Sequence, residues 1–161
     1  MANRKLVQNL EKEILGFIQA EGLLGKGEGI LLACSGGSDS TALVRWLRRS
    51  QKLQRWRLAL AHVNYGLRGR ASEGDEKFVR GLGLELSLPV FVLRASSPPN
   101  RGNFQAWARE LRYRWFGEVS AHEGFTTVAT GHTADDQAET LLDHLGRGAG
   151  PEGLAGIRPL L

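Results

Sequence analysis

The chain has 161 residues, of which 42% are hydrophobic and 24% charged, proportions that fit a globular domain large enough to bury a core. Its net charge of +4 at pH 7 is mild, so it allows an anionic partner without requiring one. The single cysteine, Cys34, excludes an intramolecular disulfide and any site built on paired cysteines, and no apolar run reaches the roughly 18 residues of a membrane span.

The N-terminal segment is charged and amphipathic and does not resemble a signal peptide, so we expect an intracellular, cytoplasmic protein with no membrane partner. Its apolar residues recur at helical spacing: Leu6, Leu10, Ile14 and Phe17. This spacing predicts a first helix over about residues 3–20, with Val7–Ala20 as the periodic part, and a glycine-rich turn after it.

The most informative segment follows that turn. An apolar run, Ile30–Cys34, predicts a strand, and the helical pattern Thr41–Arg49 comes soon after it. Between them the chain reads Ser35, Gly36, Gly37, Ser38, Asp39, Ser40. Glycines let the backbone approach an anion, and a helix N-terminus presents free N–H groups to it, so we expect a phosphate-binding loop with Ser38 or Asp39 as the helix cap. The ordinary P-loop pattern G-x-x-x-x-G-K-[ST] is absent, and the plainer alternative is a turn that only caps the helix.

Three further apolar runs predict strands at Leu58–Val63, Pro89–Leu93 and Thr126–Thr130. Helices are expected between them. Ser72 and Asp75 look like a capping box that opens the first of these helices. Its expected apolar face is Phe78, Val79, Leu82 and Leu86, and that of the next helix is Phe104, Trp107, Leu111 and Trp115. A last helix is expected from Ala134 to about Leu145, before a glycine-rich segment, 146–161.

Short apolar strands that alternate with helices predict an α/β fold, a Rossmann-like parallel sheet with helices on both faces. We expect the whole chain, 1–161, to form one such domain. In these sheets ligands bind beyond the carboxyl ends of the strands. The segments that leave those ends are 35–40, 64–70, 95–103 and 131–136.

Several polar residues fall in those segments. Asp39 and Asp136 would face one crevice from two loops, as carboxylates that hold Mg²⁺ beside phosphate oxygens do. The alternative is that Asp136 only favours the positive N-terminus of its helix. His132 can contact phosphate, transfer a proton or simply form the turn, whereas His62 fits a hydrogen-bonded structural residue. The arginines suit phosphate contacts or an ordinary solvated face: Arg68, Arg70, Arg101, Arg109, Arg112 and Arg114.

Together these motifs resemble the N-terminal catalytic domain of the tRNA(Ile)-lysidine synthetase family, within the PP-loop ATP pyrophosphatase superfamily (an adenine nucleotide alpha hydrolase-like fold). The loop at 35–40 alone matches only the superfamily. Three stretches narrow the resemblance: 62–68 is similar to H-V-[ND]-H-G-L-R, 108–113 to A-R-x-x-R-Y, and 129–157 to A-T-G-H-x-x-D-D-x-x-E-T followed by R-G-x-G-x-x-G-L-x-G-I. The resemblance spans about Ile30 to Ile157.

The resemblance implies an enzyme that uses ATP to adenylate the C2 oxygen of the wobble cytidine in the isoleucine tRNA with a CAU anticodon. The amine of free lysine then displaces AMP, giving lysidine. The implied nucleotide contacts are the loop Ser35–Ser40, His62, Gly131 and His132; Asp39 and Asp136 would hold Mg²⁺, and Asp39, Asp136 and Arg112 would be catalytic. The expected cofactors and partners are ATP, Mg²⁺, that tRNA and free lysine, with a homodimer as a further candidate.

The chain departs from the family pattern at three points. Tyr65 replaces the usual second histidine of the 62–68 motif, and Cys34 stands where a small aliphatic residue is common. The family's C-terminal tRNA-binding domains are expected to be absent. Two alternatives therefore stay open. One is a catalytically incomplete ATP-binding module or fragment that needs missing domains or a partner, and the other is a PP-loop ligase that acts on another substrate.

Overall fold

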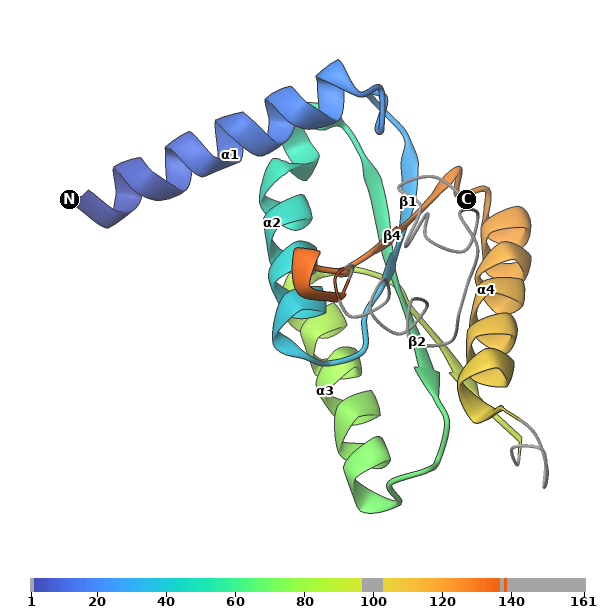
Figure 1. Cartoon of the computed structure of the whole chain (residues 1–161). Helices are drawn as coiled ribbons and strands as arrows, with labels where there is room; N and C mark the ends of the chain where they lie inside the picture. The colour runs from blue at the N-terminus through green and yellow to red at the C-terminus, as the bar shows by residue number, and fades with distance from the viewer. Residues whose placement is uncertain (1, 97–102, 137, 139–161) are drawn as a thin grey trace.

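The computed structural model describes residues 2–96, 103–136 and 138, and its centre is a parallel β-sheet (Figure 1). Within the described residues the sheet has the strand order β3-β2-β1-β4. Its strands are β1 (Gly29–Ala33), β2 (Arg57–Asn64), β3 (Val90–Arg94) and β4 (Thr127–Thr130). Leu32 of β1 is in register with Leu60 on one side and Ala129 on the other. Each predicted strand is therefore present, and both of its ends lie within one residue of the predicted bounds.

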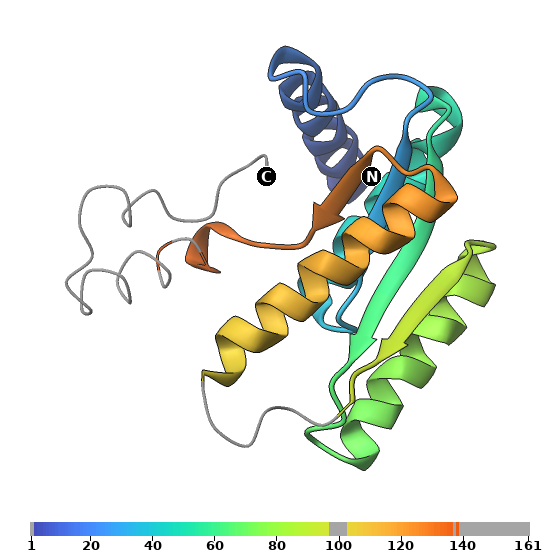
Figure 2. The same ribbon diagram turned by 90° about the vertical axis from the view of Figure 1, so that its right-hand side faces the viewer.

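Helices cover both faces of the sheet, as the alternating pattern predicted (Figures 1 and 2). They are α1 (Ala2–Ala20), α2 (Ser38–Gln54), α3 (Arg70–Leu86) and α4 (Phe104–Glu123). Side chains of α2 and α3, among them Val44 and Val79, pack with Ile30 and Leu32 on one face of the sheet. Phe116 of α4 packs with Leu31 and other residues on the opposite face. The predicted α/β fold is confirmed.

The helix α1 extends away from the sheet (Figure 1), and its Leu15 packs against the core. Ile18 is buried, and Glu11 forms an ion pair with Arg49 of α2 at 3.1 Å. Other apolar side chains of α1 are exposed: Leu6, Val7, Leu10 and Phe17.

Across the part of the chain that the structure describes, no helix combines the length and the apolar character needed to cross a membrane.

The helix starts differ from the sequence expectations at α2 and α3. Gly37, rather than Ser38 or Asp39, occupies the cap position of α2, and the helix begins three residues earlier than predicted. At α3 the cap is Gly69, with no side-chain cap, so the predicted capping box is wrong. The reason is that the Ser72 hydroxyl accepts the backbone N–H of Arg68 at 3.1 Å instead of an N–H of its own helix.

The predicted apolar faces of α3 and α4 are only partly right. Phe78 is 45% exposed, while Val79 and Leu82 are buried as expected. On α4 the buried residues are Ala108 and Phe116, one position beyond the predicted Trp107 and Trp115, which are half-buried. The start of the last predicted helix is helical at 134–136, and its remainder lies outside the described residues, apart from residue 138. The segment 146–161 lies outside them too, as does most of the loop before Asn103.

The core assignment predicts unequal costs for two leucine truncations. Leu60 is fully buried in β2, so Leu60→Ala should lower the free energy of unfolding by about 2–5 kcal/mol, because it removes packed methyl groups and leaves a cavity. Leu84 on α3 is 83% exposed, and Leu84→Ala should change stability by less than about 0.5 kcal/mol. Urea denaturation followed by tryptophan fluorescence measures both, and equal losses would contradict the assignment.

Candidate functional site

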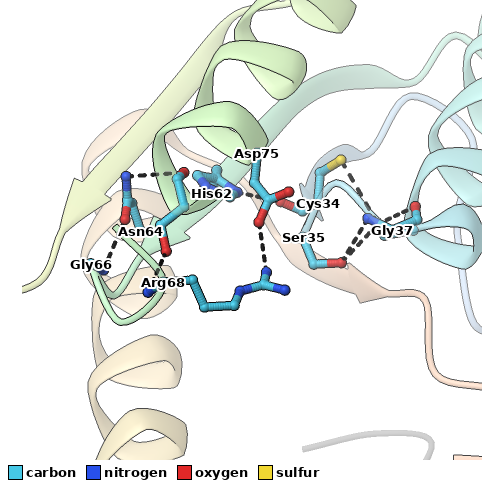
Figure 3. A network of polar contacts seen from close by, with 10 residues as sticks. Cys34, Ser35, Gly37, His62, Asn64, Gly66, Arg68 and Asp75 are labelled. Atoms are coloured by element: carbon cyan, nitrogen blue, oxygen red, sulfur yellow. Dashed lines mark hydrogen bonds and ion pairs between the residues drawn. The ribbon is translucent and has the colours of Figure 1, made fainter. Parts of the chain in front are cut away.

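The turn between β1 and α2 is held in shape by its own serine hydroxyls (Figure 3). The Ser35 and Ser40 hydroxyl oxygens lie 3.1 Å apart, and Ser40 also donates to the Gly37 carbonyl at 3.1 Å. The backbone N–H of Gly37 donates to the Ser35 hydroxyl at 3.3 Å. Gly36 turns the chain with a φ of +95°, a conformation that side chains disfavour. The turn is therefore held in shape by contacts among its own residues.

The first turn of α2 opens toward solvent. Thr41 N–H donates back to the Gly37 carbonyl at 3.1 Å, but the earlier N–H groups of a helix have no carbonyl partner within it. Gly37, Ser38 and Asp39 are exposed, whereas Ser40 is buried. Unpaired N–H groups at the positive end of a helix attract an anion. This arrangement supports the predicted phosphate-binding loop.

Gly131, which follows β4, lies against this turn. A Cβ atom at Gly131 would fall 2.9 Å from both the Cα and the nitrogen of Ser40, and 3.1 Å from the carbonyl carbon of Asp39. Only a residue without a side chain permits such a close approach to backbone. The structure thus brings together the segments 35–40 and 131–136, which are far apart in the sequence.

The residues after Gly131 form a tight polar turn. Thr133 and Asp136 cap each other: the Asp136 carboxylate accepts the N–H and the hydroxyl of Thr133, at 2.6 and 2.8 Å, and the Thr133 hydroxyl accepts the Asp136 N–H at 3.2 Å. This reciprocal pair is a capping box that the sequence analysis overlooked, although the spacing T-x-x-D shows it. The N–H and hydroxyl of Thr133 lower the pKa of Asp136, so this carboxylate is ionised at neutral pH.

His132 lies beside that box, and its Nδ1 is 2.8 Å from the Thr130 hydroxyl. Burial lowers the pKa of His132, and the charge of Arg112 lowers it further, while Asp136 opposes both effects. A lowered pKa leaves the imidazole neutral at pH 7. His132 is then suited to donate or accept a hydrogen bond, rather than to supply positive charge.

Arg112 of α4 provides positive charge at the same edge of the sheet. Its charge lowers the pKa of His132. It also acts to lower the pKa of Tyr65, but burial has the larger effect and raises that pKa. The Arg112 Nε is buried and has no hydrogen-bond partner among the described residues. Its guanidinium carbon lies 5.3 Å from the centre of the Tyr113 ring. A buried, unsatisfied donor on a cation fits a group that awaits an anionic ligand.

His62 does not reach the exposed surface of the turn. It is 4% exposed, and its Nδ1 lies 2.9 Å from the carbonyl oxygen of Cys34, the residue before Ser35. Its Nε2 has no partner among the described residues. This histidine therefore supports the start of the turn between β1 and α2 from inside the sheet.

Tyr65 shows how this chain accommodates its departure from the usual histidine. The Tyr65 hydroxyl donates to the Ala108 carbonyl of α4 at 3.0 Å. Its ring stands edge-on to Phe104 and Trp107, with ring centres 6.0 and 6.2 Å away. The residue packs the loop after β2 against the start of α4.

A buried acidic network at the ends of β2 and β3 was missed by sequence reasoning. Glu76 is 3% exposed and accepts hydrogen bonds from Arg94 (two, both at 2.9 Å), Asn64 (3.0 Å) and Arg80 (3.0 Å). Arg94 above all, then Asn64, lowers the pKa of Glu76 to about 2. The other end of Asn64 accepts the Gly66 N–H at 2.9 Å. The network therefore ties the loop after β2 to α3 and β3.

A polar pocket of about 450 Å³ opens beside this network, lined by Asn64, Gly66, Gly69, Glu73, Arg94 and Ala95. For a metal, no group of three or more His, Cys, Asp and Glu side chains is arranged as a ligand set within residues 2–96, 103–136 and 138. Mg²⁺ needs fewer protein ligands, because it commonly binds one or two carboxylates together with substrate phosphates and water.

The family model and the curated relatives that match this chain agree with the resemblance found in the sequence. The sequence profile of the PP-loop domain matches residues 6–160. The tRNA(Ile)-lysidine synthase of Chlorobaculum tepidum is 42% identical over 152 residues, covering 92% of this chain and 46% of that protein. The protein of the same name from Dehalococcoides mccartyi is 36% identical over 156 residues, covering 94% of this chain and 33% of its own length. The chain thus spans less than half the length of these curated relatives.

Among solved structures, the U34-tRNA thiolase NcsA from Methanococcus maripaludis matches with a TM-score of 0.77 and 18% sequence identity. The match covers 92% of this chain and 53% of that one. At this identity the likeness shows the fold alone, and it agrees with the parallel sheet described above.

The contact at Gly131 predicts a specific loss of stability. Gly131→Ala should lower the free energy of unfolding by about 1–3 kcal/mol, because the new methyl group overlaps the backbone of Ser40 and one of the two segments must move. Gly117→Ala on α4 is the matched control, since its added Cβ meets nothing within 4 Å and it should be neutral or stabilising by up to about 1 kcal/mol. Urea denaturation measures the free energy of unfolding of both variants. A Gly131→Ala variant as stable as the wild type would show that the contact is not tight.

The Glu76 network predicts a pH dependence. The pKa of Glu76 is about 2 in the folded chain against an ordinary 4.5, so its ionised form stabilises the fold above about pH 4.5 and this contribution disappears as the pH falls toward 2. Glu76→Gln should lower the free energy of unfolding by about 1–2 kcal/mol at pH 7, and the difference from wild type should shrink at about pH 3. Glu118→Gln, at an exposed position of α4, should have no such profile. A Glu76→Gln deficit that is constant from pH 7 to pH 3 would contradict this origin.

Proposed function

This chain belongs to the family of PP-loop domains, and from that membership we propose that it binds ATP at Ser35–Ser40 and carries the catalytic chemistry of tRNA(Ile)-lysidine formation. The observation that carries the proposal is the first turn of α2, whose open N–H groups face the edge of the sheet where β1 and β4 end side by side. The relatives of that name align with nearly all of this chain but are much longer, so the complete activity is part of the proposal.

The proposed reaction has two steps. The C2 oxygen of the wobble cytidine attacks the α-phosphorus of ATP, a new P–O bond forms, and the bond to pyrophosphate breaks. The side-chain amine of free lysine then attacks C2 of the adenylated base, loses a proton, and AMP leaves with the oxygen. Both steps develop negative charge on phosphate oxygens, and N–H groups or cations fixed in advance stabilise such charge.

The described residues fit distinct parts of this reaction. The N–H groups and hydroxyls of Ser35–Ser40 would cradle the phosphates, and Arg112 would neutralise phosphate charge from α4. His62 would hold the start of the turn in place, while Gly131 allows the neutral His132 to approach it. These roles are supported by the contacts of each residue described above.

Asp39 and Asp136 are the residues that would hold Mg²⁺. Their carboxylate oxygens are hard ligands of the kind Mg²⁺ prefers, Asp39 is exposed at the mouth of the turn, and Asp136 is kept ionised by Thr133. When bound, the ion would neutralise charge on the leaving pyrophosphate. A cytoplasmic location and the extent of the domain over 1–161, both expected from the sequence, stay predictions, and a homodimer stays a candidate.

The experiment is ATP-dependent incorporation of labelled lysine into an unmodified isoleucine tRNA transcript with a CAU anticodon, in the presence of Mg²⁺. Incorporation should require ATP and should disappear when the wobble cytidine is replaced. Asp39→Asn should reduce the rate by about 100-fold without unfolding the chain, because charge stabilisation at the phosphates is lost. Glu118→Gln, which removes an exposed carboxylate of α4, should leave the rate unchanged.

Two outcomes would contradict parts of this proposal. An Asp39→Asn variant with the wild-type rate would remove Asp39 from the metal site. Tight ATP binding without lysine incorporation would instead favour the incomplete ATP-binding module that depends on further domains or a partner.

A further inference from the structure

An ion pair lies directly beside the phosphate-binding turn. Arg68, in the loop after β2, contacts the Asp75 carboxylate of α3 at 2.7 Å. A Cβ atom at Gly36 would lie only 3.6 Å from the Cβ of Asp75, so this carboxylate stands next to the turn itself. Figure 3 shows the Arg68 side chain extending toward Ser35 and Gly37, with Asp75 above its guanidinium.

The backbone that carries Arg68 is firmly fixed. Its N–H donates to the Ser72 hydroxyl at 3.1 Å. The same loop is held at Gly66 by Asn64, which is itself held by the buried Glu76. The base of the arginine is therefore preorganised at a set position beside the turn.

The side chain of Arg68 is far less constrained. It is 72% exposed, and Asp75 is its one ion-pair partner within the described residues. An exposed ion pair of this kind contributes only about 0–1 kcal/mol, so little free energy holds the guanidinium in place. An arginine side chain is long, and its planar guanidinium can bind two oxygens of a phosphate group as it can those of a carboxylate.

Asp75 opposes a bound polyphosphate at this turn, because like charges so close repel. We propose that Arg68 is a phosphate-contacting residue that exchanges Asp75 for the phosphates of the nucleotide, and that Asp75 is its resting partner in the empty site. This inference rests on the proposed ATP site. It assigns Asp75 a role opposed to binding, since the carboxylate competes with the nucleotide for Arg68.

A second ion pair in the same fold supplies a matched control. Arg45 of α2 and Glu85 of α3 also lie 2.7 Å apart, and both side chains are exposed, by 47% and 54%. Glu85 belongs to the last turn of α3, close to the amino end of β3, whereas the phosphate-binding turn lies at the carboxyl ends of the strands. Breaking this pair tests what the loss of an exposed ion pair does when no phosphate site is near.

The experiment measures the dissociation constants of Mg²⁺-ATP and of inorganic pyrophosphate by calorimetry for wild type, Arg68→Gln, Asp75→Asn and Arg45→Gln. Arg68→Gln should weaken binding of both by about tenfold, the usual effect of losing a charge-assisted hydrogen bond. Asp75→Asn should bind at least as tightly as wild type, because the competing carboxylate is gone. Arg45→Gln should match wild type, and thermal unfolding should show that all four chains are folded.

Weaker binding by Arg68→Gln, without weaker binding by Asp75→Asn, is the result expected if Arg68 exchanges Asp75 for phosphate. If Asp75→Asn weakens binding as much as Arg68→Gln, the pair acts as a structural brace and the inference is wrong. If wild type binds ATP and Arg68→Gln binds it equally well, the inference alone fails and the ATP site stands. If wild type binds neither ATP nor pyrophosphate, the ATP site and the inference both fail.

Discussion

β1 is hydrogen-bonded along both of its edges, to β2 on one side and β4 on the other, and Ile30, Leu31 and Leu32 are completely buried. A strand enclosed in this way cannot slide without exposing its apolar side chains or breaking two ladders. β1 is also the point where the strand order of the sheet reverses: β2 and β3 lie on one side of it, and the later strand β4 lies on the other. The pairing of β1 with β4 brings together the turn that follows β1 and the segment that follows β4, and the contact between Gly131 and Ser40 is its direct result.

Two kinds of charge pairing meet at this edge. Glu76 is buried, and because the desolvation of a buried carboxylate is costly it is stable only with several donors around it, which Arg94, Arg80 and Asn64 provide. Arg68 and Asp75 are exposed, so their pairing is weak and reversible. The first arrangement makes the loop after β2 rigid, and the second leaves one side chain on that rigid loop able to respond to an anion.

The sequence alone predicted the order of the elements, because each strand is a short apolar run between turn residues. It also predicted a turn between β1 and α2, because the strand, loop and helix are contiguous in the sequence; phosphate binding by this turn stays a prediction. The capping box at Ser72 was a wrong prediction, since the competing N–H comes from the folded loop at Arg68. The contact of Glu76 with Arg94 joins residues 18 positions apart, and no local pattern indicates which of many carboxylates will be buried beneath a strand end. The sequence did not show which polar side chains meet in the folded chain when they are far apart in the sequence.

The thiol of Cys34 can report on the junction between β1 and the turn that follows it. It is the only thiol in the chain, it is 2% exposed, and its sulfur lies 3.9 Å from the Ser40 hydroxyl. Burial raises the pKa of the Cys34 thiol. An alkylating reagent therefore reacts slowly with it, because the sulfur is shielded from solvent and because little of it is in the reactive thiolate form. The rate of alkylation therefore measures how often the junction of β1 with its turn opens, and a nucleotide that braces this junction would slow the labelling of an unmodified protein.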